Sequence, residues 1–326
     1  MAGIPTISSV TPRLTLPGGR IVLHGAHLPV TTAGLPVVRL DGHPARVVFA
    51  SSSDLAVVVS DAQGGRMEAV VEGVDGRVPV DVAIPLATGL HQVDNPVFDR
   101  DGNLYVTYSG SRGQQVPVSI FRVLPGGVRE SFSSAVTNPT SMALSPDGEL
   151  FVSSRFEGTV FRLDEDGNAE TYASDLGIAC GLAFAPDGTL FVGDRSGTIF
   201  AVDRDGKTST LASLPASVAA FHLAVGPDGL YVTAPTLSAA DVVYRVTFSG
   251  EVSVMHTGFG RPQGLGFGPD GHLHVVEALA GASGLYRLGP GGAELVLSGP
   301  GLIGFAFDAA GVLAVCSGDT AYRVQV

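Results

Sequence analysis

The stretch IACGLAFAPDGTLFVGDRSGTIFAVDRDG, residues 178–206, contains most of one unit of a pattern that recurs along the chain. A short apolar run is followed by a Pro-Asp-Gly turn, a second apolar run, a polar loop, a third apolar run and a second Asp-Gly turn. Short apolar runs joined by Asp-Gly turns are typical of antiparallel hairpins, because glycine adopts the positive φ that these turns need. With the run that follows the second turn, the pattern predicts four antiparallel strands in each unit.

The turn recurs at a nearly constant spacing. Its glycines are Gly102, Gly148, Gly188, Gly229, Gly271 and Gly311, and successive spacings are 46, 40, 41, 42 and 40 residues. A period near forty with four strands per repeat is typical of β-propeller blades. We therefore expect a six-bladed propeller over residues 83–326. The last repeat provides only three strands, and residues 80–89, VDVAIPLATG, are expected to supply its fourth.

Residues 1–82 lack the repeat and alternate short β-rich runs with Gly, Pro and Asp turns, which predicts a small β-sandwich. This segment resembles the IPT/TIG immunoglobulin-like family in Pro5, SVTP (9–12), the glycine pair 18–19, IVLHGAHL (21–28), VVRLDGHPARVV (37–48) and GRVPVDVAI (76–84). The resemblance implies a module that binds or spaces other domains. The predicted fold class is all-β, an immunoglobulin-like sandwich followed by a six-bladed propeller. No Gly/Ser linker separates the two, so we expect a stiff junction.

The repeats, for example TSMALSPDGELFVSSRFEG and CGLAFAPDGTLFVGDRSG, resemble the NHL-repeat and regucalcin/gluconolactonase (SMP-30-like) propellers. In the lactonase-like branch a divalent cation sits in the central channel, held by residues at the start of the innermost strands. We call the matching positions here the first ring: Asp94, Thr140, Cys180, Phe221, Gln263 and Ile303. Asp94, in DNPVFD, stands where the family has Glu, whereas Cys180 replaces an Asn and Phe221 an Asp. A phenyl ring cannot ligate a hard cation, so the family's oxygen set is not retained.

A second ring follows from the ends of the second strands: Tyr108, Ser154, Asp194, Ala234, Glu277 and Ser317. Asp194 and Glu277 could join Asp94 to hold Ca²⁺ or another divalent cation. The competing interpretation places both carboxylates at solvated strand ends. His272 and His274 share a strand face, but the sequence offers no third ligand for zinc beside them.

Cys180 is the most pointed catalytic candidate, because a thiol at a channel mouth can act as a nucleophile if a base such as His222 activates it. The alternative is a small buried residue that fills the channel, as free cysteines usually do. Arg155 and Arg195 follow the second strands of neighbouring repeats and could together hold a carboxylate or phosphate. The alternative for the arginines is local pairing with Asp194 and Glu157. The candidate ligand-binding residues are Thr140, Arg155, Cys180, Arg195, Phe221, His222 and Gln263.

The net charge of −12 opposes binding to nucleic acid, and no apolar run of about 18 residues predicts a membrane span. No signal peptide is visible, so we expect a cytoplasmic protein, or a secreted one if a leader has been trimmed. Two functions stay open. The first is a non-catalytic propeller that binds a small molecule or a protein at its top face, at the channel mouth. The second is a divalent-cation-dependent lactonase or ester hydrolase with rearranged ligands.

Overall fold

The computed structural model describes residues 3–30, 34–60 and 64–324. These residues form thirty-two strands, β1 to β32, and no helix. Within this part of the chain there is accordingly no helix long and apolar enough to cross a membrane. The all-β prediction is confirmed.

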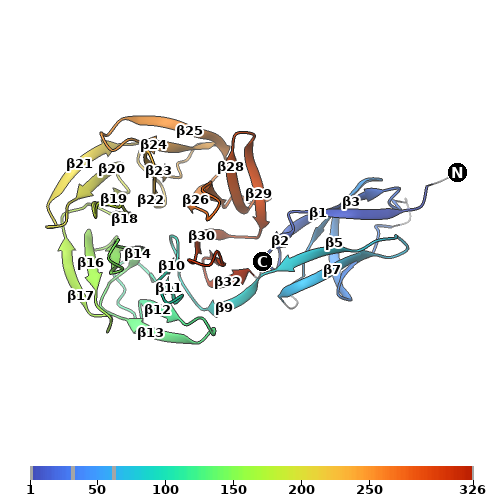
Figure 1. Ribbon diagram of the computed structural model, residues 1–326, viewed down its shortest axis with the longest axis horizontal. Helices are drawn as coiled ribbons and strands as arrows, with labels where there is room; N and C mark the ends of the chain where they lie inside the picture. The colour runs from blue at the N-terminus through green and yellow to red at the C-terminus, as the bar shows by residue number, and fades with distance from the viewer. Residues whose placement is uncertain (1–2, 31–33, 61–63, 325–326) are drawn as a thin grey trace.

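Five antiparallel sheets of four strands each are arranged in a ring, which is the arrangement of a β-propeller (Figure 1). The first contains β10 (Val97–Phe98), β11 (Leu104–Thr107), β12 (Ile120–Val123) and β13 (Arg129–Ser133). The second contains β14 (Pro139–Leu144), β15 (Leu150–Ser154), β16 (Thr159–Leu163) and β17 (Ala169–Ala173). The third contains β18 (Ala179–Phe184), β19 (Leu190–Asp194), β20 (Thr198–Val202) and β21 (Thr208–Ser213). The fourth contains β22 (His222–Gly226), β23 (Gly229–Thr233), β24 (Asp241–Val246) and β25 (Val252–Phe259).

The fifth sheet closes the ring. It contains β30 (Leu302–Phe307), β31 (Leu313–Ser317), β32 (Thr320–Val324) and β9 (Ile84–Thr88). β9 pairs antiparallel with β32, so the segment before the first repeat supplies the fourth strand of the last one, as the sequence predicted. This exchange joins the two ends of the ring by backbone hydrogen bonds.

The fifth repeat along the chain behaves differently from the other repeats. Its strands β26 (Pro262–Phe267), β27 (Leu273–Glu277), β28 (Gly284–Gly289) and β29 (Gly292–Ser298) pair antiparallel in consecutive order. They do not form a sheet of their own, because β2 (Leu14–Thr15) pairs with β29 and connects them to the N-terminal strands in one sheet of twelve. Five separate four-stranded sheets are therefore observed where the sequence predicted six.

The repeat turns have the conformation that the sequence required. All six turn glycines have positive φ, from 75° at Gly271 to 145° at Gly229. Between the sheets, the apolar strand residues form buried clusters, such as the one that contains Leu190, Val192 and Leu182. The alternation of turns and apolar runs therefore fixes both the hairpins and the packing layers of the ring.

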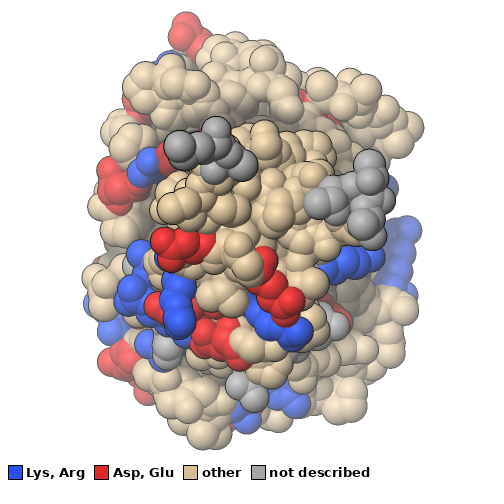
Figure 2. All heavy atoms as spheres, turned by 90° about the vertical axis from the view of Figure 1, so that its right-hand side faces the viewer, with Lys and Arg blue, Asp and Glu red and all other residues tan. Residues whose placement is uncertain are grey.

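The N-terminal strands lie to one side of the ring (Figure 1). They are β1 (Thr6–Thr11), β3 (Arg20–Ala26), β4 (Val38–Leu40), β5 (His43–Ala50), β6 (Asp54–Val58), β7 (Gly65–Val71) and β8 (Val78–Val82). They enclose a buried cluster of their own, which runs from Ile7 to Val82 in the sequence. On the face that these strands turn outward, acidic and basic side chains are interspersed (Figure 2).

The junction between the N-terminal strands and the ring is continuous β-structure. Only Ala83 separates β8 from β9, and β2 pairs in parallel with both β8 and β29. The Thr15 hydroxyl lies 2.9 Å from the Ser298 hydroxyl, and Leu16 is buried in a propeller cluster with Leu297. The absence of a flexible linker, predicted from the sequence, is thus accompanied by backbone pairing that the sequence did not reveal.

Candidate functional site

The first strands of the repeats begin beside the ends of the second strands. Ala179 pairs with Asp194, Pro139 with Ser154 and Pro262 with Glu277. The next residue along each first strand belongs to the first ring, so both predicted rings lie at the same end of the propeller. The sequence predicted the mouth of a central channel at this end, which is called the mouth below.

A hydrogen-bonded chain of polar side chains crosses the centre of the ring. Nδ1 of His222, at the start of β22, lies 2.6 Å from Oδ1 of Asp94, just before β10, and Nε2 lies 3.2 Å from Oε1 of Gln263. β22 and β10 lie on opposite sides of the ring centre (Figure 1). Because an ionised carboxylate can only accept hydrogen bonds, Nδ1 carries the proton and donates to Asp94, whichever way the Gln263 amide is turned.

These three side chains are almost sealed from water. His222 is 0% exposed, Asp94 3% and Gln263 6%. The Asp94 Oδ1 atom also accepts a hydrogen bond from the backbone N–H of Asn95, at 2.8 Å. Buried polar groups are stable only when their hydrogen bonds are made, as they are here. We call Asp94, His222 and Gln263 the polar plug, because they fill the centre of the ring.

Asn95 is a central residue that the sequence reasoning missed. Its side-chain amide donates to the Leu265 carbonyl at 2.8 Å, and its Oδ1 accepts from the Phe305 N–H at 3.0 Å. A Cβ added at Gly264 would lie 2.2 Å from Asn95 Oδ1, so glycine there makes room for the amide. A signal was present in the sequence. The residue directly after the first-ring position is Gly in CGLA and QGLG but Asn in DNPV, where it is Asn95.

Most predicted ligand-binding residues of the first ring are closed off. Thr140, Cys180 and Phe221 are each no more than 1% exposed, and the Thr140 hydroxyl donates to the Asn138 carbonyl. Burial raises the pKa of the Cys180 thiol to about 11. A thiol in this setting stays protonated near neutral pH, and His222, whose Nδ1 is bonded to Asp94, makes no hydrogen bond to it within the described residues. The structure thus places Cys180 in the packed interior and His222 in the polar plug.

The carboxylates of the second ring anchor loops. Glu277 accepts hydrogen bonds from the backbone N–H groups of Gly260, Arg261 and Leu279, at 2.6, 2.9 and 2.6 Å. Asp194 accepts from the backbone N–H groups of Ile178 and Ser196 and from the Ser196 hydroxyl. The loops that enter the first strands need acceptors for their N–H groups, and the second ring supplies them.

The three predicted metal ligands are thus not brought together. Asp94 faces His222, whereas Asp194 and Glu277 face backbone N–H groups. Among the residues that the structure describes, no three His, Cys, Asp or Glu side chains group closely enough to hold a metal ion. The donor set present does not fit Ca²⁺, which takes six to eight oxygen ligands.

Arg155 and Arg195 remain accessible at the mouth. Arg155 is half-buried and donates to the Gly110 carbonyl at 3.3 Å, and Arg195 is exposed. Burial lowers the pKa of Arg155, and the nearby Arg195 guanidinium lowers it further. The ion pairs formed by the described residues include neither arginine, so the predicted alternative of pairing with Asp194 or Glu157 is wrong.

Two further side chains lie at the same mouth. The His91 ring packs edge-on against Tyr108, with centroids 6.2 Å apart. Burial lowers the pKa of His91, and the Arg155 charge adds to the effect. Arg155 and Arg195 directly follow β15 and β19 at this end of two neighbouring repeats, an arrangement able to receive an anion.

The fold defines the class of protein as a β-propeller. No family profile and no curated protein sequence matches the chain. A nutrient-binding protein described as auxiliary, from Bacteroides ovatus, superposes with a TM-score of 0.57 at 13% identity, over 99% of this chain and 98% of that one.

Two other solved structures share the propeller. A candidate gluconolactonase superposes with a TM-score of 0.61 at 19% identity, over 74% of this chain and 91% of that one. An inactive variant of virginiamycin B lyase from Staphylococcus aureus, with quinupristin, superposes at 0.52 and 14% identity, over 94% and 99%. At these identities the likeness shows the fold alone.

Proposed function

We propose that this protein is a non-catalytic binding propeller that holds an anionic group, a carboxylate or a phosphate, at the channel mouth. The observation that supports this most is that Arg155 and Arg195, which directly follow β15 and β19 at the same end of neighbouring repeats, form no ion pair within the described residues. In a chain of net charge −12, two adjacent cations without a carboxylate partner are best explained by a ligand that supplies the negative charge.

The channel below the arginines supports binding rather than catalysis. The plug of Asp94, His222 and Gln263 is nearly solvent-free, so a bound ligand would rest on top of it. The thiol beneath the mouth has a raised pKa, and the carboxylates of the second ring are occupied by backbone N–H groups. Neither this thiol nor these carboxylates are therefore free for nucleophilic or acid–base chemistry on a ligand at the mouth.

Titration calorimetry of the full chain with inorganic phosphate and with succinate tests the proposal. A charge-assisted hydrogen bond contributes about 1.5–3 kcal/mol, so Arg155→Ala should weaken binding roughly ten- to a hundredfold. Arg195→Ala should weaken it less, because this side chain is more exposed. Arg204→Ala is the matched control, because Arg204 pairs with Asp147 at the end of the ring away from the mouth and should not affect anion binding. Equal anion binding by all three variants would refute the proposal.

The second candidate is a divalent-cation-dependent lactonase or ester hydrolase. It is favoured by one residue, Asp94, which keeps a carboxylate where the resembled family has one, and the likeness to a candidate gluconolactonase is compatible with it. Against it stands the 2.6 Å contact of Asp94 Oδ1 with His222, which engages one of the two carboxylate oxygens. Hydrolysis of a lactone series that depends on added metal and is lost in Asp94→Asn would establish this candidate.

We further infer that the ring has six blades, with β26–β29 as the unit that β2 joins to the N-terminal strands. The N-terminal module, residues 1–82, is proposed to be an immunoglobulin-like sandwich of IPT/TIG type, and residues 83–326 the propeller. The separate buried cluster formed by the N-terminal strands supports this boundary.

A further inference from the structure

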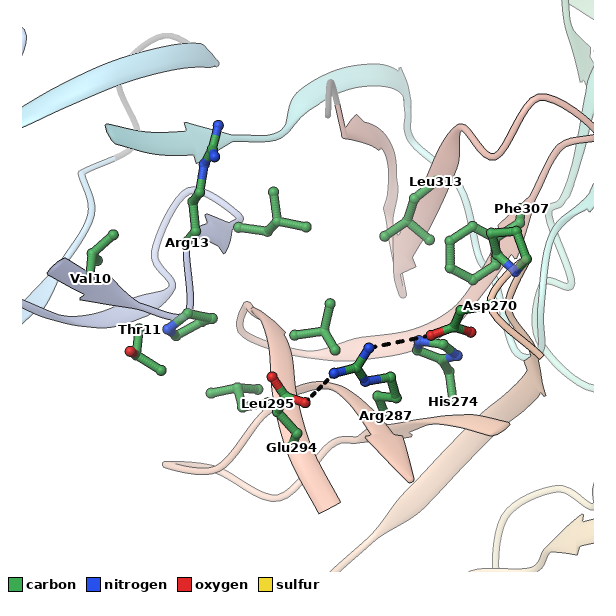
Figure 3. Close-up of a pocket in the computed structure, with 14 residues that line it drawn as sticks. Val10, Thr11, Arg13, Asp270, His274, Arg287, Glu294, Leu295, Phe307 and Leu313 are labelled. Carbon is green, nitrogen blue, oxygen red and sulfur yellow. Dashed lines mark hydrogen bonds and ion pairs between the residues drawn. The ribbon is translucent and has the colours of Figure 1, made fainter. Parts of the chain in front are cut away.

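A cleft lies where the N-terminal strands meet the propeller, at the opposite end of the ring from the mouth. It has a volume of about 500 Å³ and is walled on one side by Val10, Pro12 and Leu14 and on the other by Leu295, Phe307 and Leu313. Figure 3 shows Val10 and Arg13 on one side of the cleft and Phe307 and Leu313 on the other, with Asp270, His274 and Arg287 at the propeller side. The size suits a small organic ligand.

The walls of the cleft expose apolar surface that a ligand could cover. Val10, Leu14, Leu295 and Phe307 are all only partly buried, although they lie between two packed units. Each such side chain gains stability when its remaining surface leaves water, by about 25 cal/mol per Å². These walls therefore suit a ligand with an apolar body.

The polar side of the cleft holds more acceptors than donors. Arg287 pairs with Glu294 at 2.5 Å and with Asp270 at 3.5 Å, so one guanidinium faces two carboxylates. Arg13, the other basic residue of the cleft, is bound at 2.6 Å to Asp81 and points away from this group (Figure 3). The local excess of negative charge favours a cationic ligand.

His274 adds a polar group to the lining of the cleft. It is 4% exposed, its Nδ1 lies 3.1 Å from the His272 carbonyl, and its ring packs on Phe307. Burial lowers the pKa of His274, so the ring is neutral with its proton on Nδ1. Its Nε2 is then a hydrogen-bond acceptor on a side chain that lines the cleft, and it is not one of the buried atoms left without a partner among the described residues, so water or a ligand can reach it.

The same trio of charges elsewhere in the ring shows what the cleft adds. Arg162 of β16 pairs with Glu170 of β17 at 2.5 Å and with Glu149, just before β15, at 3.2 Å. That site has neither a buried histidine nor an N-terminal wall among its lining residues. The ion-pair trio by itself is therefore an ordinary surface feature, and the site at the junction is defined by its combination with His274 and the two apolar walls.

We propose that the junction cleft binds a small amphipathic amine, with its ammonium group toward Asp270, Glu294 and His274 Nε2 and its apolar body between the two walls. This site is separate from the anion site at the mouth and does not depend on it. A ligand held there contacts both the N-terminal strands and the propeller.

The test uses saturation-transfer NMR and calorimetry on the full chain with 2-phenylethylamine as the probe, and with 2-phenylethanol and phenylacetate as its neutral and anionic counterparts. We expect the ammonium to bind more tightly than the alcohol, and the alcohol more tightly than the carboxylate. Glu294→Gln should weaken ammonium binding about fivefold and leave the alcohol unchanged. Glu170→Gln is the matched control and should change neither.

A second variant addresses the buried acceptor. His274→Phe should remove ammonium binding while circular dichroism shows the fold intact, and if that variant fails to fold, Glu294→Gln still decides the question. The proposal is overturned if phenylacetate binds as well as the ammonium, if the two Gln variants behave alike, or if none of the three probes binds up to its solubility limit.

Discussion

The contact between Asp94 and His222 makes a quantitative prediction about stability. Replacing Asp94 with alanine removes the acceptor of two hydrogen bonds, one from the fully buried His222 Nδ1 and one from the Asn95 N–H. An orphaned buried donor costs about 1–3 kcal/mol, so Asp94→Ala should lower the free energy of unfolding by about 4 kcal/mol. That is roughly a thousandfold in the folding equilibrium, out of about 5–15 kcal/mol for a typical domain.

Asp94→Asn keeps an oxygen at the same place and should cost only about 1 kcal/mol. Guanidinium denaturation followed by far-ultraviolet circular dichroism is the suitable assay, because the chain has no Trp. A double-mutant cycle with His222→Leu should show a coupling of about 1–3 kcal/mol between the two residues.

Asp308→Ala is the matched control. Its Oδ1 also accepts two backbone hydrogen bonds, from Ala310 and Val312 at 2.8 Å, but at a half-exposed turn where water can replace it. It should therefore cost clearly less than Asp94→Ala. If the two alanine variants are equally stable, or if the changes at Asp94 and His222 are simply additive, the plug does not hold the ring together and the argument fails.

Three further predictions follow from the site. Chelator-treated protein titrated calorimetrically with Ca²⁺, Mg²⁺, Mn²⁺ and Zn²⁺ should show no tight binding, and tight binding lost in Asp94→Ala would restore the hydrolase candidate. Cys180 should react with a disulfide reagent at pH 8 about a hundredfold more slowly than an ordinary thiol, because burial raises its pKa from 9.0 to about 11. Adding denaturant should restore the ordinary rate. Fast labelling of the native protein would contradict the burial of this thiol. Burial lowers the pKa of several histidines in the folded protein, so the unfolded chain binds more protons than the folded one near pH 6. The free energy of unfolding should therefore fall as the pH drops through 6.5. His274→Phe should make this fall smaller, and an unchanged pH slope would show that His274 does not contribute to it. The histidines concerned are His91, His256 and His274.

Much of the fold could be predicted from residues close together in the sequence. Each turn glycine lies between two apolar runs. The turn requires a positive φ, which glycine adopts readily, so the glycine itself predicts the φ found at Gly188 or Gly271. The closing role of β9 could also be predicted, because a repeat with three strands needs a fourth. The two rings at the mouth followed from the constant register of the hairpins.

The chemistry of the mouth could not be predicted in the same way. The sequence placed Asp94 and Cys180 in one ring, but whether a residue of that ring faces a ligand, a partner side chain or the packed core depends on the side chains across the ring. His222 meets Asp94 across 128 residues of chain, and Asn95 reaches Leu265 across 170. The second-ring carboxylates bond to loops whose course is set by packing.

The sequence by itself therefore determined the all-β repeat, its turns and the strand that closes the ring, because these depend on backbone conformation and on hydrophobic spacing over a few residues. Only the tertiary structure decided that Asp94 and His222 seal the channel, that Arg155 and Arg195 stay open above it, and that β2 joins the N-terminal strands to β29. Thr15 and Ser298, whose hydroxyls meet at that joint, are 283 residues apart. Contacts of this kind depend on how the closed ring positions distant segments, and patterns within a few residues of sequence cannot predict that geometry.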